Sequence, residues 1–143
     1  MRILALDHGT VRIGAAVSDE LGMLAHPLEY IPAVPFTGFL ERLRQLIRER
    51  EIVLLLVGMP RNMDGTYGAA AEKVREFVHV LKEAVTVPVR TWDERLTTVQ
   101  AHRLLAEAGK SAKQRKSKVD SMAAVVLLQG YLDAQAAVLP EVP

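Results

Sequence analysis

The chain has 143 residues, enough for one compact domain and too few for two domains of ordinary size. Half of the residues are hydrophobic and 24% are charged, which is the balance of a globular protein, and 18 basic against 17 acidic residues leave a net charge of +1. The absence of cysteine excludes disulfides, thiolate zinc sites, iron–sulfur clusters and cysteine nucleophiles, and the small net charge excludes strong long-range steering of a ligand.

The beginning of the chain predicts three strands with short connections. Ile3–Leu6 is a continuous apolar run, typical of a strand that is buried on both faces. Val11–Ser18 also has the character of a strand, and Gly14 within it suggests a β-bulge or a close approach of another backbone. Met23–Ile31 supplies a third strand, so we expect an antiparallel meander.

The middle of the chain changes to helical spacing. Apolar residues at intervals of three and four predict a helix over residues 36–47, with Pro35 suited to its first position, and a second helix over residues 74–81. Between them, the apolar run Ile52–Val57 predicts a central strand that a Gly-Met-Pro turn ends.

The last part of the chain continues this alternation. A strand that begins near Val87 ends near Asp93–Glu94. A capping box at Thr97 predicts a helix that Gly109 ends, and a final helix begins near Asp120. A meander followed by alternating helices and strands indicates the α/β class, with a mixed sheet covered by helices.

The chain shows neither a linker nor a long apolar segment. We expect residues 1–138 to form a single domain and residues 139–143, which include two prolines, to be a flexible tail. No apolar run reaches the roughly 18 residues of a membrane span, and Asp7 follows the first apolar run too soon for a signal peptide. We therefore expect a cytoplasmic protein.

Three carboxylates stand where predicted elements end or begin: Asp7, Glu94 and Asp120. If the first and fifth strands are neighbours, Asp7 and Glu94 lie side by side at the carboxyl ends of the strands, where ligands bind in open α/β sheets. The last helix would bring Asp120 to the same place. The alternative is structural, because an acid at such a position often caps a turn or a helix.

A cluster of three acids favours a divalent metal. Crowded carboxylates raise one another's pKa, and a hard cation such as Mg²⁺ or Mn²⁺ removes that repulsion. Two such ions activate water and stabilise the leaving oxygen of a phosphodiester. The three acids therefore predict metal-dependent hydrolysis of phosphodiester bonds.

Basic residues near these acids are candidates for contacts with nucleic-acid phosphates. Arg12 and Arg95 closely follow two of the acids, and Arg61 lies in a glycine-rich loop, 58–68, that can present backbone N–H groups to a phosphate. A basic stretch over residues 110–118, which includes Lys116 and Lys118, directly precedes Asp120 and contains no acid. The alternatives are an ordinary strand-to-helix turn, local charge balance and a solvated basic loop.

Four motifs together resemble one family. They are residues 7–14 (DHGTVRIG), residues 57–60 (VGMP) followed by 64–65 (DG), residues 93–98 (DERLTT) and residues 118–124 (KVDSMAA). In this order and spacing they resemble the YqgF family of RNase H-like proteins, which are regarded as nucleases that mature the 5′ end of pre-16S ribosomal RNA and as Holliday junction resolvases. The resemblance covers nearly the whole chain.

The resemblance implies a fold, a site and an activity. The expected fold is an RNase H-like mixed sheet, in which an antiparallel three-strand meander is joined by two parallel strands and helices cover both faces. The implied ligands of Mg²⁺ or Mn²⁺ are Asp7, Glu94 and Asp120. The expected protein is a nuclease acting on structured RNA, as a monomer or a homodimer.

Other functions remain open at this point. One alternative is a Holliday junction resolvase that acts on branched DNA. Another is a non-catalytic RNA-binding factor of ribosome assembly, which metal chelation would leave unchanged. The actin-like ATPases and sugar kinases share the Asp-x-Gly hairpin, but they need far more chain than 143 residues.

Overall fold

The computed structural model describes residues 1–62, 64–94 and 121–137. Its elements in chain order are β1 (Arg2–Asp7), β2 (Arg12–Ser18), β3 (Ala25–Pro32), α1 (Phe36–Glu49), β4 (Ile52–Met59), α2 (Ala69–Ala84), β5 (Val89–Asp93) and α5 (Met122–Ala137). The helix predicted after Thr97 and the tail predicted over residues 139–143 fall outside the described residues.

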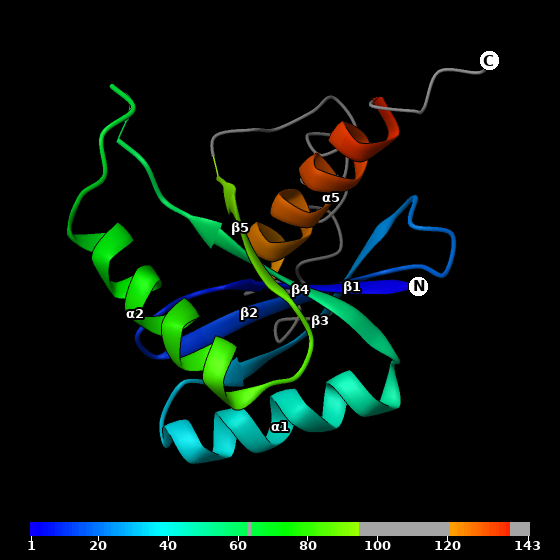
Figure 1. Ribbon diagram of the computed structural model, residues 1–143, viewed down its shortest axis with the longest axis horizontal. Helices are drawn as coiled ribbons and strands as arrows, with labels where there is room; N and C mark the ends of the chain where they lie inside the picture. Colours follow the sequence, from blue (N-terminus) through cyan, green and yellow to red (C-terminus); the bar gives the residue numbers. More distant parts are fainter. Residues whose placement is uncertain (63, 95–120, 138–143) are drawn as a thin grey trace, which may run out of the picture.

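The strands form one mixed sheet in the order β3-β2-β1-β4-β5 (Figure 1). β1 pairs antiparallel with β2, and β2 pairs antiparallel with β3. β4 pairs in parallel with β1 on one side and with β5 on the other. The predicted meander with two parallel strands is therefore confirmed.

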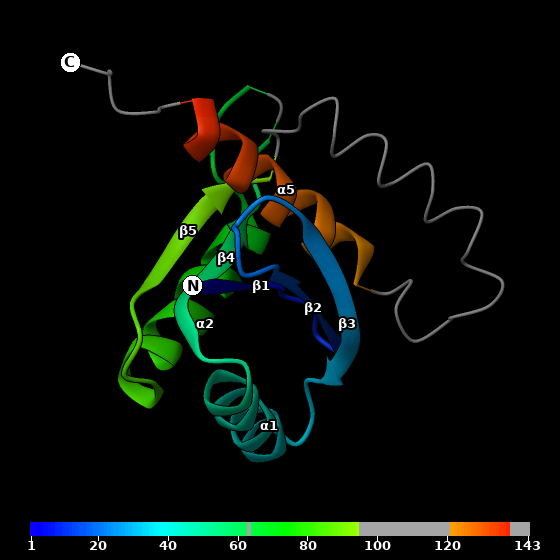
Figure 2. The same ribbon diagram turned by 90° about the vertical axis from the view of Figure 1, so that its right-hand side faces the viewer.

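Alternation along the central strands divides the core into two layers. Leu4 and Leu6 of β1 pack in a layer with buried residues of α1 and α2, whereas Ala5 between them packs in a layer with α5. Figures 1 and 2 show α5 on one face of the sheet and α1 and α2 on the other. The prediction of helices on both faces is confirmed.

α5 lies against the meander and is buried over most of its length. Its one fully buried amide, Gln129, accepts a hydrogen bond from the backbone N–H of Ala25 at 2.9 Å and donates to the carbonyl oxygen of Met23 at 2.9 Å. These bonds fix α5 against the start of β3. Among the described residues, no helix is both long and apolar enough to cross a membrane.

The boundaries of some elements differ from the predictions. β3 begins at Ala25 rather than at Met23, because Met23 donates its N–H to the Asp19 carboxylate at 2.9 Å and so belongs to the turn. β5 begins at Val89, directly after Pro88, which has no N–H for a sheet bond. The pairing of β2 with β3 shifts register at Gly14, where a bulge was expected, but the extra residue lies in β3: one residue separates Ile13 from Ala15, and two separate their partners Ile31 and Leu28.

Candidate active site

Three parallel strands end at the same edge of the sheet. Asp7 is the last residue of β1, Met59 ends β4, and Glu94 directly follows β5. The neighbour relation that the sequence suggested for β1 and β5 is wrong, because β4 lies between them. The side chains of Asp7 and Glu94 nevertheless share a hydrogen bond across β4.

Gly58 explains how two carboxylates meet across an intervening strand. Leu6 pairs with Val57 and Gly58 pairs with Trp92, so Gly58 lies between the ends of β1 and β5. A Cβ atom on Gly58 would stand 2.5 Å from Oε1 and 2.9 Å from Cγ of Glu94. Because Gly58 has no side chain, the Glu94 side chain has room to lie over β4 at this position.

Sequence reasoning missed this role of Gly58 and interpreted the residue as part of a turn and of the glycine-rich loop 58–68, whereas it lies within β4. The signal lies in the strand Ile52–Met59, whose other residues are all large and apolar. A glycine near the end of such a strand indicates a close approach of another group. The backbone N–H of Glu94 donates to the carbonyl oxygen of Met59 at 3.3 Å, which holds the residue at the strand end.

The acid pair is electrostatically strained when no cation is bound. Partial burial raises the pKa of Asp7, and the hydrogen bond from Glu94 and the neighbouring His8 oppose that rise. The pKa of Glu94 is raised to about 7 by partial burial, by the charge of Asp7, by the hydrogen bond to Asp7 and by the charge of Asp93. One proton shared by the pair, carried by Glu94 and accepted by Asp7, is the expected state near neutral pH.

A cavity of about 410 Å³ opens beside the acid pair. Asp7 and Glu94 line one part of it, and Thr10, Lys73 and the first turn of α2 line the rest. Lys73 was not among the residues singled out from the sequence. It places a cationic side chain in the same cavity as the two carboxylates.

His8 also lines this cavity, where it packs against the core. Its ring lies 4.7 Å from the ring of Phe77, centroid to centroid. Burial lowers the pKa of His8, the charge of Asp7 raises it, and the charge of Lys73 lowers it further, with a net decrease. The imidazole is therefore mostly neutral near pH 7 and supplies little positive charge to the acid pair.

The third predicted acid, Asp120, lies outside the described residues, but the structure describes its neighbour, Ser121. Ser121 is fully buried, and its Oγ accepts a hydrogen bond from the backbone N–H of Ala15 at 3.1 Å. Ala15 pairs with Leu6 of β1, and Gly14 pairs with Asp7. The start of α5 is thus attached to β2 at the level of Asp7.

We expect Ser121→Ala to lower the free energy of unfolding by about 1–3 kcal/mol, because it leaves the buried N–H of Ala15 without its partner. Urea denaturation measures this loss. Ser18→Ala is the matched control, since the Oγ of Ser18 accepts from the N–H of Ile3 at 2.8 Å at the opposite end of the sheet. Both variants should lose stability and only Ser121→Ala should also lose activity; equal activity in the two would show that Ser121 has no part in the site.

The predicted basic residues are only partly within the described chain. Arg12 is exposed, and its guanidinium lies 5.0 Å from the ring centre of Tyr30. Arg61 forms an ion pair with Asp93 at 3.6 Å, one residue from Glu94. Arg95, Lys116 and Lys118 lie outside the described residues.

The donor chemistry of the acid pair fits a hard divalent cation. Asp7 and Glu94 supply carboxylate oxygens within hydrogen-bond reach of each other, and a cation between them would replace the shared proton. Within residues 1–62, 64–94 and 121–137, no three Asp, Glu, His or Cys side chains come together as a complete metal site.

The chain matches a known family and its members over nearly its whole length. The family model described as "RuvX: Holliday junction resolvase" matches residues 1–134. A protein of Halothermothrix orenii named "Putative pre-16S rRNA nuclease" is 48% identical over 135 residues, which cover 94% of this chain and 96% of that protein. A protein of the same name from Symbiobacterium thermophilum is 50% identical over 141 residues, covering 99% and 98% of the two chains.

Two solved structures share the fold at low sequence identity. RuvC of T. thermophilus in complex with a Holliday junction substrate aligns with a TM-score of 0.58 and 15% identity, covering 99% of each chain. The fowlpox virus resolvase in complex with Holliday junction DNA aligns with a TM-score of 0.58 and 8% identity, covering 94% of this chain and 99% of that chain. These likenesses confirm the expected RNase H-like fold.

Proposed function

Since this chain belongs to the RuvX (YqgF) family, we propose that it is a metal-dependent nuclease that hydrolyses phosphodiester bonds in the 5′-end maturation of pre-16S rRNA. The observation that carries the proposal is the Asp7–Glu94 pair, two hydrogen-bonded carboxylates of raised pKa at the carboxyl ends of parallel strands. The ribosomal RNA substrate is favoured because relatives with that name share about half of their residues with this chain.

We propose that Asp7, Glu94 and Asp120 hold Mg²⁺ or Mn²⁺. Asp7 continues the row of β1 side chains that faces α5, and Ser121, the neighbour of Asp120, is bonded to β2 at that level. Both observations support a meeting of the third acid with the first two. Bound there, a divalent cation supplies electrostatic stabilisation of the charge that develops on a phosphodiester during hydrolysis.

The other residues of the site bind and orient the nucleic acid in this proposal. Lys73 and Thr10 line the cavity of the acid pair, where they contact the phosphate that is to be cleaved. Arg12, Arg61, Arg95, Lys116 and Lys118 contact phosphates farther along the strand. Trimming of a precursor RNA in the cytoplasm needs only a monomer with a single domain over residues 1–138, whereas symmetric cleavage of a junction needs a homodimer.

The experiment offers the purified protein a precursor 16S rRNA fragment and a four-way DNA junction in parallel, with Mg²⁺, with Mn²⁺ and with a chelator. We expect metal-dependent cleavage of the RNA near its mature 5′ end. Cleavage of the junction alone favours the resolvase alternative, which the family description supports. RNA binding that chelation leaves unchanged, without cleavage of either substrate, supports the non-catalytic alternative and contradicts the proposal.

The raised pKa of Glu94 predicts how metal binding depends on pH. Below about pH 7 Glu94 is protonated, and a cation must displace that proton to bind. The affinity for Mn²⁺ should therefore rise up to about tenfold for each pH unit below 7 and level off above it. Calorimetric titration between about pH 5.5 and pH 8.5 measures this, and Glu94→Gln should bind weakly with little dependence on pH. A flat profile for the wild type would mean that Glu94 takes no part in binding.

A further inference from the structure

A groove lies between α2 and the ends of β4 and β5, near the edge of the sheet that carries the acid pair. It is a hollow of about 410 Å³ lined by Met59 at the end of β4, by Thr91 of β5, by Tyr67 and by the α2 residues Arg75, Val78, His79 and Lys82. We call it the α2 groove. Met59 also accepts the backbone hydrogen bond of Glu94, so the groove and the site share a boundary.

The charged side chains that line the α2 groove, Arg75 and Lys82, are basic, and His79 lies between them on the same helix. Arg75, His79 and Lys82 are spaced four and three residues apart, so they follow one face of α2 over about 10 Å. Arg75 pairs with Glu72, and His79 pairs with Glu83 at 3.4 Å. The side chains of Glu72 and Glu83 are highly exposed, and exposed ion pairs of this kind are weak enough for a phosphate to compete with them.

Tyr67 adds an aromatic surface at the end of the groove nearest the site. Its side chain is 46% exposed, and the guanidinium groups of Arg61 and Arg75 lie 4.4 and 4.7 Å from its ring centre. Arg61 in turn pairs with Asp93, which precedes Glu94. An exposed ring flanked by cations beside a line of basic residues is typical of surfaces that bind single-stranded nucleic acid.

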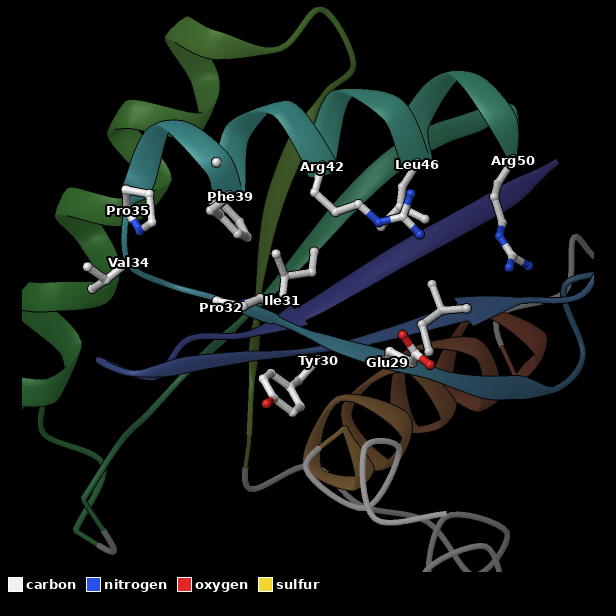
Figure 3. A pocket seen from close by; sticks show the side chains of 12 residues that line it. Glu29, Tyr30, Ile31, Pro32, Val34, Pro35, Phe39, Arg42, Leu46 and Arg50 are labelled. Carbon is white, nitrogen blue, oxygen red and sulfur yellow. The ribbon is translucent and has the colours of Figure 1, made fainter.

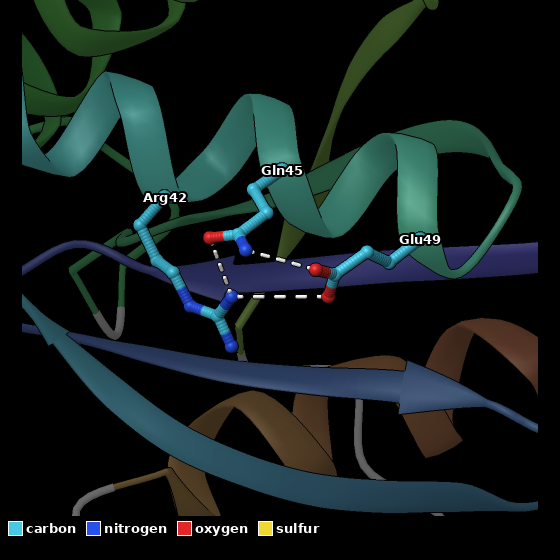
Figure 4. A network of polar contacts seen from close by, with 3 residues as sticks. All are labelled: Arg42, Gln45 and Glu49. Atoms are coloured by element: carbon cyan, nitrogen blue, oxygen red, sulfur yellow. Dashed lines mark hydrogen bonds and ion pairs between the residues drawn. The ribbon is translucent and has the colours of Figure 1, made fainter.

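A second hollow of the described chain differs in charge. It lies between β3 and α1, has a volume of about 640 Å³ and is lined mainly by apolar side chains with Arg42, Arg50 and Glu29 (Figure 3). Arg42 is held by Gln45 at 2.9 Å and by Glu49 at 3.9 Å (Figure 4). Glu29 lines this hollow together with its two arginines, whereas no acidic residue lines the α2 groove.

We propose that the α2 groove binds the single-stranded segment of the RNA substrate next to the bond that is cleaved. One base stacks on Tyr67 in place of one of the two guanidinium groups that lie over its ring, and successive phosphates lie along Arg75, His79 and Lys82. The inference rests on the proposed nuclease function, which sets the path of the RNA: the RNA strand passes from the acid pair over Met59 and then runs along α2. It assigns the groove to the flank of the substrate rather than to the reacting phosphate.

Fluorescence anisotropy of a labelled oligouridine of about 12 nucleotides, without divalent ions and over a range of salt concentrations, tests the proposal. We expect Tyr67→Ala to weaken binding about tenfold and Tyr67→Phe to restore it, because stacking needs only the ring. Arg75→Ala and Lys82→Ala should each reduce the slope of log K against log salt by about 0.7, the value for one phosphate contact on a single strand.

Arg50→Ala is the matched control, since it removes one positive charge from the hollow between β3 and α1. It should leave affinity and salt slope at the wild-type values, and all variants should keep the thermal midpoint within a few degrees. Unchanged binding in Tyr67→Ala, Arg75→Ala and Lys82→Ala, or an equal loss in Arg50→Ala, would overturn the proposal. An equal loss on a blunt RNA duplex would overturn its single-stranded part.

The failure of this inference is distinguishable from failure of the nuclease proposal. Binding is measured without metal and needs no turnover, whereas the nuclease proposal is tested by cleavage. If the wild-type protein cleaves neither substrate, but the α2-groove variants bind oligouridine more weakly than the wild type does, the groove proposal is supported and the nuclease proposal is contradicted. If the wild-type protein cleaves precursor RNA and the α2-groove variants bind oligouridine as tightly as the wild type does, the nuclease proposal is supported and the groove proposal is contradicted.

Discussion

Replacing Asp7 by asparagine should reduce cleavage at least about 100- to 1,000-fold, with no loss of folding, because it removes a charged oxygen ligand at the centre of the site. Asparagine has nearly the same shape as aspartate, so the pairing of β1 with β2 and β4 should remain. Initial rates on the precursor RNA in Mn²⁺, together with a circular dichroism spectrum, provide the measurement.

The same variant should be more stable than the wild type when metal is absent. The folded-state pKa of Glu94 is raised from 4.5 to about 7, so ionisation of the pair destabilises the fold progressively as pH rises through that window. Asp7→Asn removes one of the repelling charges. The gain in thermal midpoint should therefore be largest above about pH 7 and vanish below about pH 4.5.

Thermal unfolding of both proteins in a chelating buffer at about pH 8 and pH 4 measures this gain. Glu29→Gln is a suitable control, because Glu29 is an exposed carboxylate of β3 that lines the hollow between β3 and α1 and not the cavity of the acid pair. It should change neither the rate nor the pH dependence of stability. Wild-type turnover in Asp7→Asn would remove Asp7 from the mechanism. A thermal midpoint of Asp7→Asn below that of the wild type at about pH 8 would show that the charges of Asp7 and Glu94 do not destabilise the fold.

Gly58→Ala should cause the second large loss of activity, of about 100-fold. The new Cβ would stand 2.5 Å from Oε1 of Glu94, and this side chain is the flexible partner, so the carboxylate moves rather than the strand. A displacement of about 1 Å in a reacting group is enough for a loss of this size. The overall fold should persist, because β4 otherwise prefers a residue with a side chain.

Gly38→Ala is the matched control for this substitution. The nearest atom to its new Cβ is a side-chain carbon of Pro35 at 3.6 Å, an ordinary contact, and the change should stabilise α1 by about 0.5–1 kcal/mol without altering the rate. In a Glu94→Ala background, Gly58→Ala should cost nothing further, as a double-mutant cycle would show. Independent, additive losses would mean that Gly58 acts through some other group.

The fold could be predicted from the sequence because its signals are local. The apolar runs of β1 and β4 and the helical spacing in α1 and α2 each indicate one element, and the order of elements then restricts the sheet. The first residues of β3 and β5 were less well predicted. They depend on the Asp19 turn and on Pro88, where particular hydrogen bonds decide the boundary.

The site was predicted less completely than the fold, because it depends on the order of strands in space. The sequence identified Asp7 and Glu94 as acids at strand ends, but it could bring them together only on the condition that their strands are neighbours, and β4 lies between β1 and β5. Periodicity contains no information on which strands are neighbours, and the role of Gly58 follows only from the intervening position of β4. Lys73 was missed for the same reason, since it lines the cavity from near the start of α2, a helix whose position beside the acid pair is set by the fold.

The most direct test of the account is a crystal structure of the protein soaked in Mn²⁺, with anomalous scattering used to locate the ion. We expect a peak within about 2.1–2.3 Å of carboxylate oxygens from both Asp7 and Glu94, with a further acidic ligand from Asp120. A peak elsewhere, or none at an Mn²⁺ concentration that supports cleavage of the precursor RNA, would contradict the claim that these acids hold the catalytic metal.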